Sequence, residues 1–140
     1  MAEAAQNSNV PLSAERNYAR VTGWLYLLLA VAGLFTNNLW NMFNLSGMMT
    51  VIHAVIGITG IAVANRGTAR LHRVYNLALA LTLTTWGVVG TVSPRWLQPY
   101  PLPLENALHT LTGIWGFYGA GQALFARLTR RKGLTHRKAS

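Results

Sequence analysis

Two histidines occupy matching positions in an otherwise apolar sequence. His53 and His109 each begin the pattern His-x-x-x-Gly-x-x-Gly, and the two copies are 56 residues apart. Because the chain has only 4 histidines, two of them in matching frames indicate a duplicated unit. An imidazole can donate and accept hydrogen bonds, carry a proton, or ligate a metal. His53 and His109 are therefore the first candidates for chemistry.

Three interpretations of this histidine pair are open. In the first, each neutral imidazole hydrogen-bonds to neighbouring helices and pins the fold together. In the second, His53 and His109 ligate one b-type haem or another pigment, for which neutral imidazole is a common axial ligand. In the third, they relay protons, or bind a small ligand or a metal ion. The first interpretation needs no cofactor, and the sequence spacing assigns no metal centre.

An acidic residue accompanies only the second histidine. Glu105 lies four residues before His109, which places both on one face of a helix. It could hold an imidazole tautomer or titrate with it, as a partner of the histidine. The alternative is a solvated carboxylate at a helix start, where the macrodipole favours negative charge. The first copy of the repeat has Met49 at this place, so the carboxylate is not duplicated.

Small residues follow each histidine at helical spacing. Steps of four and then three residues place them on the same helix face as the histidine. Small residues at such spacing let membrane helices approach each other closely. We therefore predict helix-packing contacts at Gly57, Gly60, Gly113 and Gly116.

The elements that must position these residues are long runs without charge. Hydrophobic residues make up 51% of the 140 residues and charged residues 11%, against roughly 25% charged in typical soluble domains. The uncharged runs are 21–65, 74–94 and 106–126, and the first is long enough for two crossings of a membrane. A soluble helical bundle is the alternative, but its helices would carry a charged face. We predict an all-α polytopic membrane protein with four transmembrane helices.

The repeat extends beyond the histidines to whole helical hairpins. Three more pairs keep an offset of 57 residues: Arg16 and Arg73, Tyr18 and Tyr75, and Gly33 and Gly90. A cleavable signal peptide is an alternative for the first run, but its duplicated partner within the chain favours retention. The predicted units are a disordered N-terminal tail at 1–15, a transmembrane domain at 16–126 with hairpins at 16–65 and 73–126, and a basic cytoplasmic tail at 127–140. Parallel repeats of this kind are related by a pseudo-two-fold axis along the membrane normal.

Basic residues are distributed asymmetrically along the chain. Of 12 lysines and arginines, only Arg95 falls in a predicted outer loop. This positive-inside pattern predicts a multi-pass protein of the cell inner membrane with both termini cytoplasmic. It accounts for the net charge of +9 more simply than nucleic-acid binding does. The tail residues expected to face lipid head groups are Arg127, Arg130, Arg131 and Lys132.

The second copy of the motif carries a family resemblance. It reads Asn106-Ala-Leu-His109-Thr-Leu-Thr-Gly113-Ile-Trp-Gly116. Together with the first copy, over residues 16–125, it resembles a family of small bacterial four-helix membrane proteins catalogued as a domain of unknown function. The first copy has Thr50 in place of Asn106, so that asparagine cannot serve both halves. The resemblance implies the fold and the bacterial inner membrane, but no reaction, substrate or cofactor.

No catalytic set is visible in the sequence. Cysteine is absent, only 3 acidic residues occur, and there is no glycine-rich phosphate loop or nucleophile elbow. We therefore expect that the protein is not an enzyme but a scaffold or an accessory subunit of a membrane complex. Its expected partners are the lipid bilayer and further copies of itself or a larger membrane complex. Nucleic acid is not an expected partner. The alternatives are a haem or pigment protein that uses His53 and His109, and a small transporter or proton conductor.

Overall fold

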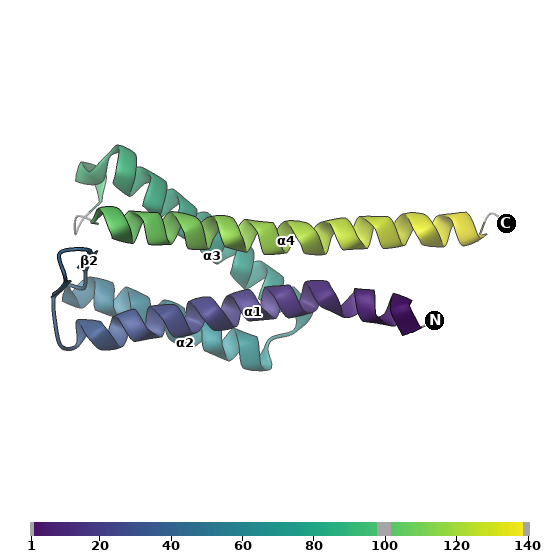
Figure 1. Ribbon diagram of the computed structural model, residues 1–140, viewed down its shortest axis with the longest axis horizontal. Coiled ribbons are helices and arrows are strands. Elements are labelled where there is room, and N and C mark those ends of the chain that lie inside the picture. Colours follow the sequence, from purple (N-terminus) through teal and green to yellow (C-terminus); the bar gives the residue numbers. More distant parts are fainter. Residues whose placement is uncertain (1, 98–101, 139–140) are drawn as a thin grey trace.

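The structure is a computed structural model that describes the backbone of residues 2–97 and 102–138 and the side chains of residues 14–97 and 102–122. Within these ranges the chain is all-α apart from one short strand pair and a 3-10 turn (Figure 1). The elements are α1 (Ala2–Gly33), β1 (Asn38–Leu39), β2 (Phe43–Asn44), α2 (Gly47–Arg66), α3 (Ala69–Val92), η1 (Pro94–Trp96) and α4 (Pro103–Lys138). The predicted all-α class is thereby confirmed.

The helices form two hairpins in tandem. α1 packs most extensively against α2, and α3 packs most extensively against α4. The hairpins meet where α1 contacts both α3 and α4. In Figure 1, α3 runs diagonally past α4, and the start of α1 lies at the same end of the bundle as the end of α4.

Glycines at equivalent places mark a close approach of the two helices within each hairpin. A Cβ atom added to Gly57 would lie 2.7 Å from the backbone nitrogen of Leu27. A Cβ atom added to Gly113 would likewise lie 2.7 Å from the backbone nitrogen of Thr84. Leu27 and Thr84 are 57 residues apart, which is the offset of the first helix of the repeat. Real Cβ atoms essentially never come this close to backbone, so the contact requires glycine in both hairpins.

Two tyrosines make reciprocal contacts between the hairpins. The hydroxyl of Tyr75, in the second hairpin, lies 2.8 Å from where a Cβ of Gly60 would stand. The hydroxyl of Tyr18, in the first hairpin, lies 2.7 Å from where a Cβ of Gly116 would stand. Because the two tyrosines are equivalent in the repeat, this exchange is what a pseudo-two-fold relation between the hairpins produces.

Both ends of the chain are more helical than the sequence analysis predicts. α1 begins at Ala2, so the structure describes the segment 1–15, predicted as a disordered tail, as helix from there on. Its alanines are the strongest helix formers, and the helix continues without a break into the apolar run. Likewise α4 continues through the basic segment to Lys138, since arginine and lysine also favour helix. The side chains of Arg127, Arg130, Arg131 and Lys132 lie outside the described residues, so their contact with lipid stays a prediction.

A short strand pair that the sequence analysis missed connects α1 to α2. Asn38 pairs with Asn44 and Leu39 pairs with Phe43 in antiparallel register. Two residues of the intervening turn, Trp40 and Asn41, have φ values of 53° and 56°, in the left-handed region that few residues other than glycine and asparagine adopt. This turn folds back onto the start of α4, which contacts β2.

Among the described residues, α2 and α3 are long and apolar enough to cross a membrane, by length and composition. This finding bears on two of the predicted crossings. The other two predicted crossings correspond to parts of α1 and α4, which pack along those two helices.

Candidate functional site

His53, Glu105 and His109 come together near the end of the bundle that carries the strand pair. One nitrogen or oxygen atom from each side chain lies within 4.8 Å of the other two. The side chains are almost completely buried, with exposed fractions of 1%, 0% and 3%. Each histidine is the seventh residue of its helix, counted from Gly47 in α2 and from Pro103 in α4. The duplicated helix start thus sets the two imidazoles at the same depth, with ring centroids 6.1 Å apart.

Tyr26 on α1 completes the cluster, and the sequence analysis did not identify it. Its ring is fully buried and lies 5.4 Å from the ring of His53 and 5.8 Å from that of His109. The planes of Tyr26 and His109 differ by only 7°, so these rings are stacked. The Thr112 hydroxyl donates to the carbonyl of Leu108 at 2.7 Å, so the Tyr26 hydroxyl is the donor in the 3.2 Å hydrogen bond to Thr112. This bond and the stacking fix the plane of the His109 ring.

A difference between the two halves of the repeat is the one sequence signal that could have identified Tyr26. The equivalent residue in the second hairpin is Leu83, at an offset of 57. Both residues are buried, but only Tyr26 carries a polar atom into the cluster. In the same way Met49, the counterpart of Glu105, is 2% exposed. The unshared residues are therefore the polar ones that join the shared histidine pair.

Glu105 is buried, and this contradicts its interpretation as a solvated carboxylate at a helix start. Its Oε2 atom accepts hydrogen bonds from the backbone N–H groups of Asn44 at 3.2 Å and Leu102 at 3.3 Å. The first donor belongs to β2 and the second directly precedes α4. Its Oε1 atom is buried and has no hydrogen-bond partner within the described residues. The strand pair and the helix start thus orient the carboxyl group through one oxygen only.

Within the described residues, three of the four ring nitrogens lack the hydrogen bonds that the first interpretation requires. Both ring nitrogens of His53 and the Nδ1 atom of His109 are buried without a hydrogen-bond partner in the part of the chain that the structure describes. An unsatisfied buried donor or acceptor costs about 1–3 kcal/mol, and such groups are rare in proteins. Polar atoms of three neighbouring side chains are therefore open to a ligand at one place.

Two imidazoles and one carboxylate can ligate a divalent transition-metal ion. A haem could take both imidazoles as axial ligands, but its macrocycle would have to fit beside the Tyr26 ring that packs against both of them. Proton exchange among the three groups is also chemically feasible, because imidazole and carboxyl groups both titrate.

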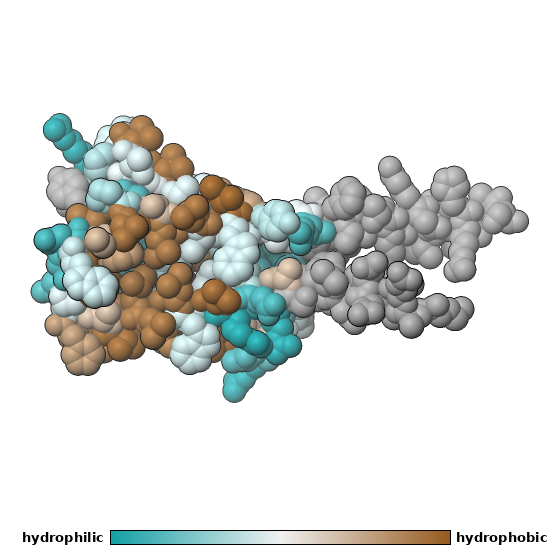
Figure 2. All heavy atoms as spheres, in the orientation of Figure 1, coloured by the Kyte–Doolittle hydropathy of each residue, from teal (hydrophilic) through white to brown (hydrophobic). Residues whose placement is uncertain are grey.

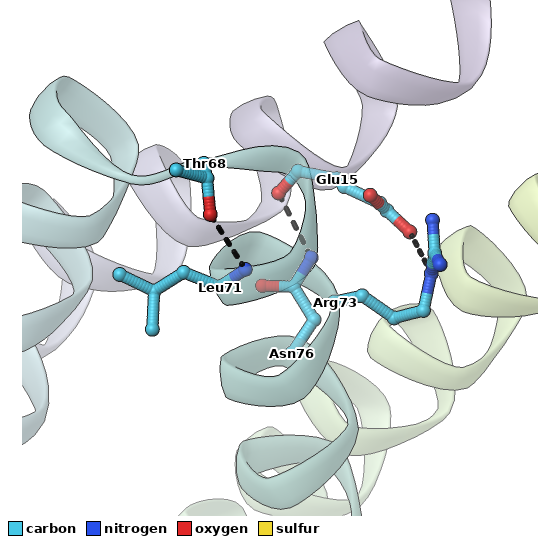
Figure 3. Close-up of polar contacts among 5 residues, drawn as sticks. All are labelled: Glu15, Thr68, Leu71, Arg73 and Asn76. Atoms are coloured by element: carbon cyan, nitrogen blue, oxygen red, sulfur yellow. Dashed lines mark hydrogen bonds and ion pairs between the residues drawn. The ribbon is translucent and has the colours of Figure 1, made fainter.

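A second polar cluster lies at the opposite end of the bundle, shown in Figure 3. The guanidinium of Arg73 on α3 donates to the buried carboxylate of Glu15 on α1 at 3.1 Å. The Asn76 amide donates to the carbonyl oxygen of Glu15 at 2.9 Å. These bonds tie the second hairpin to the first, which the sequence analysis did not predict.

His72 also belongs to this end of the bundle. Its side chain is 7% exposed, and its Nε2 atom lies at hydrogen-bond distance, 2.8 Å, from the carbonyl oxygen of Val63. This histidine fixes the connection between α2 and α3. Unlike His53, it has a partner within the protein.

A scan against protein-family models found no match, and neither did searches of the curated proteins and of the solved structures. The resemblance to small four-helix membrane proteins therefore stays an expectation based on the duplicated motif. Any functional proposal depends on the geometry of the chain itself.

Proposed function

We propose that this chain is an integral protein of the cell inner membrane that crosses it four times, with both termini in the cytoplasm. We further propose that it is not an enzyme but a scaffold or an accessory subunit of a larger membrane complex. The observation that carries the proposal is the distribution of side chains, since large apolar residues are exposed while many polar ones are buried.

Large apolar side chains cover the outside of the helices. Figure 2 shows apolar residues across the middle of the described part and hydrophilic residues gathered toward its ends. Soluble monomers rarely expose contiguous apolar patches larger than a few hundred Å². Residues of this kind that are at least 45% exposed occur on every helix: Val21, Trp24, Leu28, Val51, Val55, Ile58, Leu81, Val88, Leu111 and Ile114.

The interior holds many polar and ionisable side chains beside an apolar cluster that includes Leu29, Leu45 and Leu83. In lipid such groups face the centre of a bundle, where they find partners or perform functions. The buried polar residues of the described part are Glu15, Thr22, Thr50, His53, His72, Asn76, Glu105, Asn106, His109 and Thr112. Lipid as the surrounding solvent accounts for both halves of this distribution.

The close packing of the helices supports four crossings. If α2 and α3 cross the bilayer, then the parts of α1 and α4 that lie against them must be at the same depth. Basic residues support the orientation, since Arg16, Arg66, Arg70 and Arg73 lie toward one end and Arg95 toward the other. The end with more basic residues is expected in the cytoplasm.

Cysteine accessibility tests the membrane topology directly, because the natural chain contains no cysteine. We expect a membrane-impermeant thiol reagent to label Asn41→Cys in intact cells, and Asn65→Cys only after the membrane is opened. Both positions are exposed, which makes them a matched pair. Extraction of the protein by alkaline carbonate, or equal labelling of both cysteines in intact cells, would contradict the proposed topology.

Purification in mild detergent tests the role as a subunit. We expect the chain to elute with a partner protein or as a homo-oligomer, because the described residues include no domain outside the bundle. A lone monomer that captures no partner and does not self-associate would count against the scaffold role, even if the topology is right.

One observation favours a haem protein as the second candidate. The imidazole rings of His53 and His109 lie 6.1 Å apart at equal depth, which is close enough for both to bind one iron. A visible spectrum of protein from haem-sufficient cells decides the matter. The absence of a Soret band, or a band that persists when both histidines are replaced by alanine, would exclude this candidate.

A further inference from the structure

We propose that His53, Glu105 and His109 bind one divalent transition-metal ion of the Zn²⁺ type between the two hairpins. Two imidazole nitrogens and one carboxylate oxygen form a donor set typical of such ions. This inference goes beyond the scaffold role and does not depend on it, since the site is defined by contacts within one chain.

The unpartnered atoms of the cluster are the main argument. His53 and His109 come from different hairpins, yet each presents buried ring nitrogen without a partner among the described residues. The Oε1 atom of Glu105 is in the same state. A single cation would give all three side chains a ligand at once, and it would compensate the charge of a carboxylate that is 0% exposed.

The distances require only small side-chain movements. The three ligand atoms lie within 4.8 Å of one another. Around a tetrahedral Zn²⁺ ion at roughly 2.0–2.2 Å, neighbouring ligand atoms are about 3.4 Å apart. Closure onto the ion therefore needs shifts of about an ångström, which rotations of the imidazoles and of the carboxyl group can supply.

Surrounding contacts already orient two of the ligands. The backbone N–H groups of Asn44 and Leu102 hold Oε2 of Glu105, and the stacked ring of Tyr26 holds the plane of His109. Contacts of this kind around metal ligands fix their orientation and raise metal affinity. They distinguish the cluster from a chance meeting of three titratable side chains.

Comparison of the two halves of the repeat points the same way. Duplication alone accounts for two histidines at one depth, but not for a carboxylate beside them. The counterpart of Glu105 is the buried Met49, and that of Tyr26 is the buried Leu83. A buried carboxylate without a compensating charge destabilises a fold, and a cation bound beside the histidine pair would supply that charge.

The donor set also defines which ions should bind. Imidazole suits Zn²⁺, Co²⁺ and Fe²⁺, whereas Mg²⁺ and Ca²⁺ prefer oxygen ligands throughout. Three protein ligands leave a fourth position for water or an exogenous ligand. Because the ligands come from α2 and α4, the ion would join the first hairpin to the second.

Metal titration of the full-length protein tests the proposal. The chain is purified in detergent with a histidine-free tag, stripped with a chelator, and titrated with Zn²⁺, Co²⁺ and Mg²⁺. We expect one equivalent of Zn²⁺ or Co²⁺ per chain, visible d–d absorption from Co²⁺, and no binding of Mg²⁺. Glu105→Met, which installs the residue of the first hairpin, and His109→Gln should each weaken binding at least tenfold.

The remaining histidines provide the matched controls, because His72→Gln and His136→Gln should leave the affinity unchanged. If a ligand variant fails to fold, X-ray absorption of Zn²⁺ bound to the unmodified chain should still report two imidazoles and oxygen ligands. Substoichiometric Zn²⁺, binding that Glu105→Met and His109→Gln leave intact, or loss of binding in a control variant would overturn the proposal. The cysteine accessibility test of the topology is unaffected by any of these results.

Discussion

Replacement of Gly113 by alanine tests a close contact between the helices of the second hairpin. The new Cβ atom would lie 2.7 Å from the backbone nitrogen of Thr84 and 2.9 Å from the carbonyl oxygen of Ala80. Ordinary van der Waals contact begins at 3.4 Å, and backbone atoms cannot rotate away as a side chain can. The helices α3 and α4 must therefore separate locally.

Such overpacking costs about 1–3 kcal/mol of stability. Alanine also favours helix over glycine by up to about 1 kcal/mol in water, which offsets part of the cost. We therefore expect Gly113→Ala to lower the free energy of unfolding by about 1–2 kcal/mol. Gly113 follows His109 by one helical turn, so the separation should also disturb the stacking of His109 on Tyr26.

Unfolding by a denaturing detergent, followed by circular dichroism in mixed micelles, measures this difference. Gly121→Ala is the matched control on the same helix, because nothing lies within 4 Å of a Cβ added there. We expect the control to be as stable as the unmodified chain or slightly more stable. If Gly113→Ala unfolds within about 0.5 kcal/mol of the control, the close approach of α3 and α4 at this glycine is refuted.

Three further predictions concern the polar clusters. Arg73→Met should lower the free energy of unfolding by about 3–5 kcal/mol, because it leaves the buried carboxylate of Glu15 without its partner. The double variant Arg73→Met with Glu15→Gln should regain part of that free energy, as measured by its unfolding. A hundredfold excess of Zn²⁺ over its dissociation constant should stabilise the unmodified chain by about 2.7 kcal/mol, visible as a higher thermal midpoint that Mg²⁺ does not produce. The double variant Tyr26→Leu with Glu105→Met replaces each residue by its counterpart in the other hairpin. In the absence of metal it should unfold no more easily than the unmodified chain, since apolar replacement of buried polar groups is often neutral or stabilising. It should also lose the stabilisation by Zn²⁺.

The depth and the pairing of the histidines could be predicted from the sequence. The repeat places His53 and His109 in equivalent frames, and the uncharged runs around them predict helices. The structure starts both helices six residues before the histidine, at Gly47 and Pro103. These features depend on local periodicity and on the copying of one hairpin, which a single sequence records.

The rest of the cluster depends on contacts between the hairpins, which local periodicity does not encode. Tyr26 approaches both imidazoles because α1 packs against α4 as well as α2. Glu105 is buried because the strand pair after α1 folds over the start of α4 and donates the N–H of Asn44. The local sequence around Glu105 would be the same if its carboxylate were exposed to water, so the sequence alone does not reveal its burial.

The ion pair at the opposite end escaped prediction for a related reason. Glu15 and Arg73 stand at the edges of the apolar runs, where charged residues are usually solvated. Their partnership arises only because the two hairpins pack with corresponding ends together, which brings the first turns of the apolar part of α1 beside α3.

The duplicated and the unduplicated residues have separable roles. Residues shared by both halves make the contacts that build the bundle, namely the glycine approaches and the exchange of Tyr18 and Tyr75. Residues present in one half only, Tyr26 and Glu105, surround the histidine pair and contribute little that packing alone requires, because Leu83 and Met49 are buried equally well at the equivalent positions. A perfectly symmetric chain would still bring two imidazoles together, but without a carboxylate to complete a ligand set. Specialised chemistry in this fold is therefore expected where the symmetry of the repeat is broken.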